Sequence, residues 1–471
     1  MRRLSGMDAA SVELETQATP LHMQAVLVFD TSTIPGGYRY DRLRDLLAAR
    51  IHVVPPLLQQ LVRVPGGIHR PVWVDAPDLD WDYHLPRVLS TEPLDLEFLS
   101  RFAAELAGQR LDRSRPLWQL QVVEDPTDDR IALVARVHHA LMDGLGGMEF
   151  MAELFELEPN TPSVEPPTAI GGAAPPSGAE LVGRAVADFA SMPAAAARFA
   201  REIAQSVSRI ARQPRADDDT APRPFTAPRT PFNQRLSASR AVSLRSLPFD
   251  TVREIAERTD STVNDVVLAV AAGAVREYLL AHDALPYRRL VAGVPAAAGE
   301  GGTFGGNTFS FLFVRLPTDV AAPLDRLFAA RAEAQRGKRA GEFGLDTLGH
   351  LLDLTTPPAL DALFSFYRSV LVGRAAPLWN LIVSNVPGPP VPLYLGGARL
   401  VGMYPLGPVY DGIGLNVTVL SREDALDVGI VACRDLVADT ELLAAQLADA
   451  LHELAEAVGV HAGAPTPDEL P

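Results

Sequence analysis

Two adjacent histidines, His138 and His139, are followed after three intervening residues by Asp143-Gly144. The apolar run 131–137 precedes them, so a buried strand is expected to end at the histidine pair and a glycine-containing loop to follow. A histidine in such a place is held rigidly and still faces an opening. Neutral imidazole can take the proton of an attacking alcohol, whose own pKa lies far above neutrality. The pattern therefore predicts general-base chemistry of the kind that ester formation needs.

Successive strand residues point to opposite sides, so one histidine is expected to face the opening and the other to be packed. Asp143 is placed to hold the loop by pairing with an arginine, or to orient the base, and Gly144 permits a tight turn. No cysteine or acidic cluster completes a metal shell around the pair, so we predict no metal. On these residues alone, a pair of purely structural histidines remains the alternative.

The composition is that of a globular protein, with 47% hydrophobic residues. The formal net charge of −16 argues against nucleic acid, which requires a basic surface. Cys433 is the only cysteine, which excludes an internal disulfide and fits a reducing compartment. No run approaches the roughly 18 apolar residues of a membrane span, and the N-terminus does not resemble a secretory signal. We therefore expect a cytoplasmic protein.

Proline-rich stretches near residues 159–176 and 214–231 divide the chain, whose 471 residues exceed what one core fills. We predict an N-terminal domain over 1–158, a linker over 159–240 and a C-terminal domain over 241–471. Hydrophobic periodicity predicts helices over 41–51, 94–111, 250–258, 265–282 and 436–458. Strands are expected over 25–30, 119–124, 130–137, 289–294, 308–316, 381–384, 413–420 and 425–432. The fold class is therefore α+β, with a cleft between two halves as the expected site.

The linker itself contains a candidate helix over 179–213, in which arginines outnumber acidic residues and Pro193 is expected to cause a kink. A basic amphipathic helix on an acidic protein suits a peripheral contact with the inner membrane or a lipid droplet. A helix packed across the body of the protein, with solvated arginines, is the alternative.

The pattern His-His-x-x-x-Asp-Gly after an apolar strand resembles the signature of the chloramphenicol acetyltransferase-like, coenzyme A-dependent acyltransferases. Further motifs make the chain similar to the bacterial wax ester synthase/diacylglycerol acyltransferase family. They occur in the family's order along the chain: Leu4-Ser5-Gly6-Met7-Asp8, Glu15-Thr16, Pro20-Leu21-His22, Pro116-Leu117-Trp118, Val263-Asn264-Asp265, Gly306-Asn307 and Ser384-Asn385-Val386-Pro387-Gly388-Pro389.

This resemblance implies two chloramphenicol acetyltransferase-like domains of mixed sheet and helices, with a tunnel between them. It implies His139 as the base, His138 as its supporting neighbour and a mainly structural Asp143. Acyl-CoA would be a substrate, the acceptor a diacylglycerol or a long-chain alcohol, and no cofactor is expected. Residues expected to bind substrate or shape the site are Gly144, Asn264, Asp265, Asn307, Ser384, Asn385 and Trp118.

Several of these residues have an ordinary structural explanation. Thr262 and Asp265 fit a capping box at a helix start. Trp118 fits a core position, and Asn385 fits a turn cap. One departure concerns the segment after the strand near residue 290, where the family usually has a Pro-Val-Ser-x-Arg-like sequence and this chain has Ala296-Ala297-Ala298.

Two alternative functions stay open. The protein could be an acyltransferase of the same superfamily that uses another thioester donor or alcohol, or a lipid-binding or lipid-droplet protein with weak catalysis.

Overall fold

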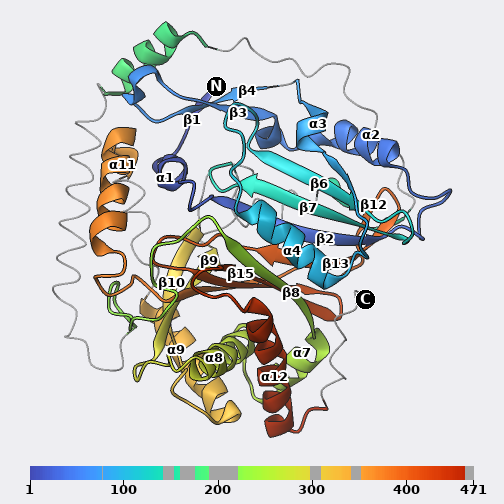
Figure 1. Cartoon of the computed structure of the whole chain (residues 1–471), viewed down its shortest axis with the longest axis vertical. Helices are drawn as coiled ribbons and strands as arrows, with labels where there is room; N and C mark the ends of the chain where they lie inside the picture. Colours follow the sequence, from blue (N-terminus) through green and yellow to red (C-terminus); the bar gives the residue numbers. More distant parts are fainter. Residues whose placement is uncertain are drawn as a thin grey trace.

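The computed structural model describes residues 1–76, 78–141, 153–159, 176–189, 221–297, 309–340 and 352–461. Two six-stranded mixed sheets lie face to face at its centre, and helices cover their outer surfaces (Figure 1). Asp143, Gly144, Asn307 and the part of the expected linker helix beyond residue 189 lie outside the described residues. Within the described part, residues 178–189 are helical.

The first sheet belongs mainly to the N-terminal half, and only its β5–β6 pair is parallel. Its order is β12 (Tyr394–Leu395), β13 (Ala398–Leu406), β2 (His22–Asp30), β7 (Arg130–His138), β6 (Trp118–Glu124) and β5 (Arg87–Leu89). A small sheet has the order β1 (Arg2–Arg3), β4 (Val72–Asp75) and β3 (Gln59–Val62). The helices of this half are α1 (Gly6–Leu14), α2 (Tyr40–Arg50), α3 (Trp81–His84) and α4 (Leu96–Ala107), with three short 3-10 turns, η1 (Ile51–Val53), η2 (Pro55–Leu58) and η3 (Pro65–Gly67).

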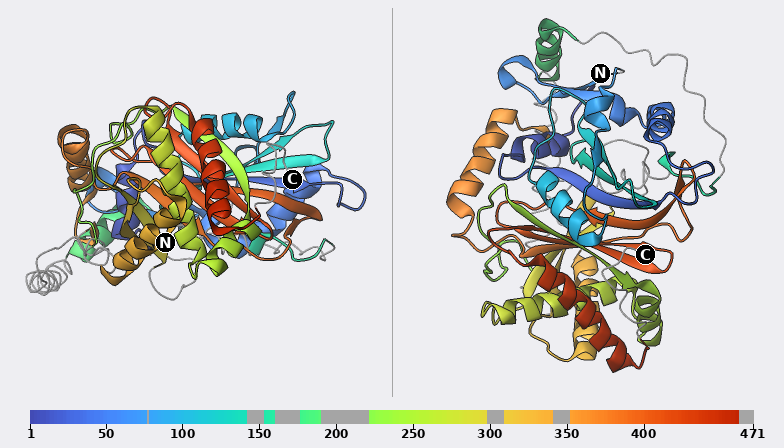
Figure 2. Two further views of the ribbon diagram at one scale, coloured as in Figure 1. Left: turned by 90° about the horizontal axis from the view of Figure 1, so that it is seen from below. Right: turned by 45° about the vertical axis from the view of Figure 1, so that its right-hand side comes forward.

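The second sheet contains parallel pairs on both sides of its third strand. Its order is β10 (Phe309–Leu316), β9 (Leu290–Ala297), β11 (Leu381–Val386), β14 (Leu415–Arg422), β15 (Ala425–Cys433) and β8 (Arg240–Pro248). The helices of this half are α7 (Phe249–Arg258), α8 (Val263–Ala281), α9 (Pro323–Ala340), α11 (Pro357–Phe366) with one π-helical turn, η4 (Tyr367–Leu371), and α12 (Thr440–Val458). Helices α7, α8, α9 and α12 cover the outer face of this sheet, where the largest apolar core lies (Figures 1 and 2).

A third apolar core joins the two halves. Val26 and Val134 of the first sheet pack with Val242 and Val431 of the second, and α4 adds Leu99 to the same cluster. The buried face of α4 is the one that its periodicity predicts. Because this core is shared, burial of its apolar area stabilises the docking of one half on the other as well as each half alone.

The predicted domain boundaries need correction, because β12 and β13 follow residue 241 in the chain yet complete the N-terminal sheet. Asp427 of β15 holds β13 in this position beside the second sheet. It accepts hydrogen bonds from Met403 N at 2.8 Å, Ser246 Oγ at 2.6 Å and Arg422 Nε at 3.2 Å. Burial raises the pKa of the Asp427 carboxyl. The end of the predicted linker also differs, since Phe232 is part of the C-terminal core.

Apart from the linker helix expected over 179–213, which is described only as far as residue 189, the predicted helices and strands are confirmed, with ends that shift by a few residues. The two predicted hairpins are the antiparallel pairs β6–β7 and β14–β15. The strand expected over 25–30 begins earlier, at His22, and the helix expected over 436–458 begins at Thr440, where Asp439 caps it. These hairpins and helices are local, so hydrophobic periodicity was sufficient to find them.

The crossing of β13 over β15 leaves no room for a side chain at Gly429, where an added Cβ would lie 2.0 Å from the Pro405 carbonyl oxygen. We expect Gly429→Ala to lower the free energy of unfolding by about 3 kcal/mol, because backbone must move to accommodate it. Gly183→Ala is the matched control, because that helical position has open space within 4 Å. It should stabilise by up to about 1 kcal/mol. Chemical denaturation measures both, and equal values would contradict the account of the crossing.

Candidate active site

The predicted histidine pair lies at the end of β7, beside the start of β2. His138 is the strand's last residue and is paired directly with His22. Its backbone N–H donates to the Leu117 carbonyl at 2.9 Å, and the N–H of His139 donates to the Leu21 carbonyl at 2.9 Å. The pair is therefore held between both neighbouring strands, and His22 joins it as a third histidine.

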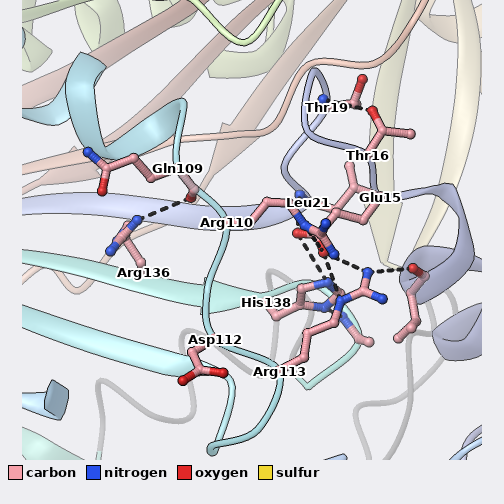
Figure 3. Close-up of polar contacts among 12 residues, drawn as sticks. Glu15, Thr16, Thr19, Leu21, Gln109, Arg110, Asp112, Arg113, Arg136 and His138 are labelled. Carbon is pink, nitrogen blue, oxygen red and sulfur yellow. Dashed lines mark hydrogen bonds and ion pairs between the residues drawn. The ribbon is translucent and has the colours of Figure 1, made fainter. Parts of the chain in front are cut away.

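A buried carboxylate, Glu15, lies beside His138 (Figure 3). It accepts hydrogen bonds from Leu21 N at 3.3 Å, from Arg110 Nε at 3.0 Å and from Arg113 through Nε at 3.0 Å and Nη2 at 2.6 Å. His138 Nε2 lies 3.7 Å from Glu15 Oε1, and both side chains are only 1% exposed. One carboxylate thus joins two arginines, a strand start and a histidine.

Local structure explains why Glu15 reaches this position. Ser5 caps α1 by accepting from Asp8 N, and the helix ends at Leu14, so Glu15 is the first extended residue. Two backbone hydrogen bonds between Thr16 and Thr19 then close a tight turn that leads into β2. Arg110 and Arg113 come from the connection between α4 and β6. Arg113 also donates to the Val12 carbonyl near the end of α1, which ties this connection to the helix.

A hydrogen bond to the His138 ring determines its tautomer. The N–H of Ala140 donates to His138 Nδ1 at 3.0 Å, so Nδ1 acts as an acceptor. The proton of the neutral ring must therefore be on Nε2, on the side of Glu15. The Ala140 N–H thus occupies the lone pair of Nδ1, while Nε2 faces the Glu15 carboxylate at 3.7 Å, beyond hydrogen-bond distance.

Burial controls the charges in this cluster. Desolvation lowers the pKa of His138 to about 4, despite the opposing effect of Glu15. Burial also lowers the pKa of His22 well below its ordinary value, and Arg136, His138 and Arg240 act in the same direction. For Glu15, burial raises the pKa, but His138, Arg113 and Arg110 outweigh it and the net shift is downward. Near neutral pH the cluster therefore contains an ionised carboxylate and neutral His22 and His138.

The side chain of His139 points in a different direction from that of His138. Its hydrogen bond to Leu21 continues the strand pairing by one residue, so alternation places its side chain on the face opposite that of His138. It is 8% exposed, against 1% for His138. Both histidines are buried, and His138 is the more deeply packed of the two, whereas the opening expected beside the other histidine stays a prediction.

Trp118 is a core residue. Its indole N–H donates to the Leu57 carbonyl at 2.7 Å, and its ring stacks on His84 with 4.3 Å between centroids. It is 1% exposed. Its strand β6 pairs with β7, where Trp118 lies opposite Val137, so it supports the histidine-bearing strand through packing.

The residues at the start of α8 divide into a cap and a half-buried neighbour. Asp265 Oδ2 accepts from Thr262 N at 2.9 Å, and Asp265 N donates to Thr262 Oγ1 at 3.2 Å. This is the capping box that the sequence suggested, and it uses the Asp265 carboxylate for structure. Asn264 is half-buried in the first turn, and no described contact brings it to the histidines.

Ser384 and Asn385 lie on opposite faces of β11. Ser384 shares its face with Val386, which packs against the N-terminal core, so Ser384 is on the side of the histidine-bearing half. Asn385 shares its face with Val383 and the helix-covered core. In the Pro387-Gly388-Pro389 turn, a Cβ at Gly388 would lie 2.1 Å from the Ser421 carbonyl oxygen. This turn is therefore a close backbone contact with β14.

The segment that departs from the family's sequence is described only in part. Ala296 packs against the helix-covered core, and Ala298 lies outside the described residues. A half-open pocket of about 630 Å³ is present in the N-terminal half, lined by Phe29, Ile131 and residues of α2. Phe29 lies seven positions along β2 from His22, roughly 23 Å of strand. The pocket is therefore distinct from the histidine cluster.

A family model described as "Wax ester synthase/diacylglycerol acyltransferase catalytic domain" matches residues 4–267, and "WS/DGAT C-terminal domain" matches residues 305–455. The chain belongs to this family. The expected resemblance is confirmed, and the match includes the histidine pair, Glu15 and both arginines. The protein is accordingly an acyltransferase of the wax ester synthase/diacylglycerol acyltransferase family.

Relatives and solved structures agree with this membership. A Mycobacterium tuberculosis protein, described as a candidate diacylglycerol O-acyltransferase, is 34% identical over 97% of this chain and 90% of its own. The wax ester synthase/diacylglycerol acyltransferase from Marinobacter aquaeolei VT8 superposes with a TM-score of 0.70 and 27% identity, covering 97% of this chain and 100% of that one. The starter condensation domain of rhizomide synthetase superposes at 0.55 with 15% identity, covering 99% and 96%, which shows the fold alone. The predicted α+β, two-domain fold class is confirmed.

Sequence reasoning did not assign roles to Glu15, Arg110, Arg113 or His22. Glu15 and His22 were noted only as part of motifs similar to the wax ester synthase/diacylglycerol acyltransferase family. A usable signal existed in the arginine density of Arg110-Leu111-Asp112-Arg113-Ser114-Arg115, directly before the Pro-Leu-Trp motif. This cluster of arginines did not indicate its partner, because Glu15 lies 95 residues before Arg110 along the chain.

Replacing the Glu15 carboxylate should damage the cluster severely. We expect Glu15→Gln to lower the free energy of unfolding by about 3 kcal/mol, because two partly buried arginines lose their counter-charge. Glu97→Gln is the control, since its pair with Arg101 is exposed and should contribute less than about 1 kcal/mol. Denaturant titration at neutral pH measures both. Equal losses would show that Glu15 does not organise the cluster.

The lowered pKa of His138 predicts a pH-dependent stability. Below pH 6.5 the unfolded chain protonates this histidine, whereas the folded protein does so only near pH 4. The free energy of unfolding should therefore fall as pH decreases from about 6.5 to about 4, by up to about 1.4 kcal/mol per pH unit from this group. His138→Asn, which keeps an acceptor and a donor, should remove this part of the slope. Denaturation curves across this range test it, and identical slopes would contradict it.

Proposed function

We propose that the protein transfers a fatty acyl group from acyl-CoA to the hydroxyl of diacylglycerol, with long-chain alcohols as further acceptors and His139 as general base. The observation that carries this proposal is that the lone pair of His138, on Nδ1, already accepts from the Ala140 N–H, while its Nε2 faces the buried Glu15 carboxylate. His139 is then the member of the pair that can serve substrate. The names of the Mycobacterium and Marinobacter relatives support the choice of substrates.

The proposed reaction is a single displacement. His139 takes the proton of the acceptor hydroxyl as its oxygen attacks the thioester carbonyl carbon. The carbon–oxygen bond of the ester forms, the carbon–sulfur bond breaks, and the imidazolium returns the proton to the coenzyme A thiolate. Acyl-CoA is a substrate here, and the balanced step requires no further cofactor. The Gly144 backbone and the Asn264 amide are our candidates for donors to the oxyanion.

The non-catalytic alternative, a lipid-binding protein of the same fold, is favoured by the Ala296-Ala297-Ala298 departure. The ordered Glu15–His138 cluster argues against it, because a chain that only binds lipid has no need of a buried charged support beside a histidine. No helix among the described residues is long and apolar enough to span a membrane. We propose a cytoplasmic enzyme that meets its lipid substrates at a membrane or droplet surface.

The decisive variant is His139→Ala. Purified protein is incubated with palmitoyl-CoA and either diolein or hexadecanol, and free thiol and ester are measured together. We expect the variant to lose about 10²–10⁴-fold in ester formation, because the hydroxyl proton has no acceptor. His452→Ala, on the exposed face of α12, is the matched control and should retain wild-type rates. Thiol release that is equal in wild type and His139→Ala would contradict the assignment, and the preferred alcohol identifies the acceptor class.

A further inference from the structure

Helix α11 and the turn η4 that continues it present apolar residues on two faces. The inner face packs against α1: Leu360 and Phe364 contact Ala10 and Met7 in a small core. On the outer face, Leu363, Phe366 and Val370 are 51%, 53% and 43% exposed. A helix that is apolar on both faces is normally covered on both.

The outer face is a continuous apolar surface. Leu363, Phe366 and Val370 are spaced as i, i+3 and i+7, so they form a single stripe along the helix. Between them the exposed positions are small or uncharged, and Asp361 near the start is the stripe's acidic neighbour on this helix. Large exposed apolar surface of this kind marks a site of interaction.

The far end of the stripe is basic. Arg235 Nε donates to the Arg368 carbonyl at 2.8 Å, and Arg374 Nη1 donates to the Ser369 carbonyl at 2.6 Å. Both arginines are exposed, and within the described ranges neither forms an ion pair with a carboxylate. The apolar stripe therefore ends at two exposed cations. Their charge is complementary to an anionic surface.

The stripe is close to the histidine cluster in the fold. Helix α11 rests on α1 at one edge of the molecule in both views (Figures 1 and 2). Gly6 N at the start of α1 donates to Asp353 Oδ1 at 2.6 Å, and Arg70 pairs with the same carboxylate. The end of α1 leads directly to Glu15, 3.7 Å from His138. One helix therefore separates the stripe from the support of the site.

We propose that Leu363, Phe366 and Val370, with Arg235 and Arg374 at their end, form a docking face that inserts into an anionic lipid surface. The apolar side chains enter the acyl boundary and the guanidinium groups contact lipid phosphates. Docking there brings the histidine edge of the molecule to the phase that holds a water-insoluble acceptor. The choice of acceptor rests on the proposed function, whereas the lipid contact itself does not.

The first experiment is flotation of the full-length protein with vesicles of phosphatidylcholine alone or mixed equally with phosphatidylglycerol. We expect binding to the mixed vesicles, weakened by salt. The Leu363→Ser/Phe366→Ser variant should bind about tenfold or more weakly, because two apolar side chains no longer leave water. Phe328→Ser is the matched control, since Phe328 is 45% exposed on α9, and it should bind as wild type.

Arg235→Gln/Arg374→Gln keeps the apolar stripe and a donor at each carbonyl, and should lose the preference for phosphatidylglycerol. This second variant also keeps the test valid if the serine variant is unstable. Equal binding of all variants, or no binding by wild type, would overturn the proposal. So would a wild-type dimer in sedimentation that Phe366→Ser converts to monomer, because a second copy would then cover the face.

Activity separates this proposal from the proposed function. With octanoyl-CoA and hexanol, both soluble, the serine variant should turn over at the wild-type rate. With diolein in mixed vesicles it should be slower, in proportion to its lost binding. A wild type that binds vesicles without making ester would leave the docking face standing and reject the acyltransferase assignment. If the serine variant lost activity equally in the soluble assay and in the vesicle assay, the docking role would be rejected.

Discussion

The buried carboxylate of Glu15 is the constraint on which the site depends. An ionised group in an interior position is unstable unless charges and hydrogen bonds compensate for lost water. Here the compensation comes from Leu21 at the start of β2 and from Arg110 and Arg113 in the α4–β6 connection. The carboxylate therefore fixes three chain segments against the end of β7.

This arrangement separates the roles of two identical side chains. His138 is neutral and buried and has a defined tautomer, because Ala140 N–H occupies Nδ1 and Glu15 faces Nε2. The backbone N–H of His139 donates to the Leu21 carbonyl, and strand alternation places its side chain on the opposite face. A base must be oriented without losing its lone pair to the scaffold. His138, whose Nδ1 accepts from the Ala140 N–H, therefore contributes to the positioning of the strand end that carries His139.

The sequence predicted what local periodicity and local caps determine. Hairpins β6–β7 and β14–β15, helix α4 and the Thr262–Asp265 cap were all found in this way. Non-local relations were missed: β13 crosses into the N-terminal sheet, and Glu15 meets arginines about a hundred residues away. A strand's own residues specify that it will pair, but its partner depends on how the whole chain packs. Trp118 and Asp265 belong to motifs of the family and were therefore expected to bind substrate or shape the site. In the structure Trp118 is a core residue and Asp265 forms a helix cap.

The crossing of β13 has a consequence for how the two halves act. It places Met403 and Tyr404 of the C-terminal half in the N-terminal sheet, where Asp427 and Ser246 hold them through hydrogen bonds. Val386 of β11 likewise packs against the N-terminal core, so the face that carries Ser384 approaches the histidine-bearing half. This shared core and these hydrogen bonds fix the relative position of the two halves. The histidine pair of one half and the Ser384-bearing face of the other are thus held in a common frame, and acyl transfer between two bound substrates depends on preorganisation of this kind.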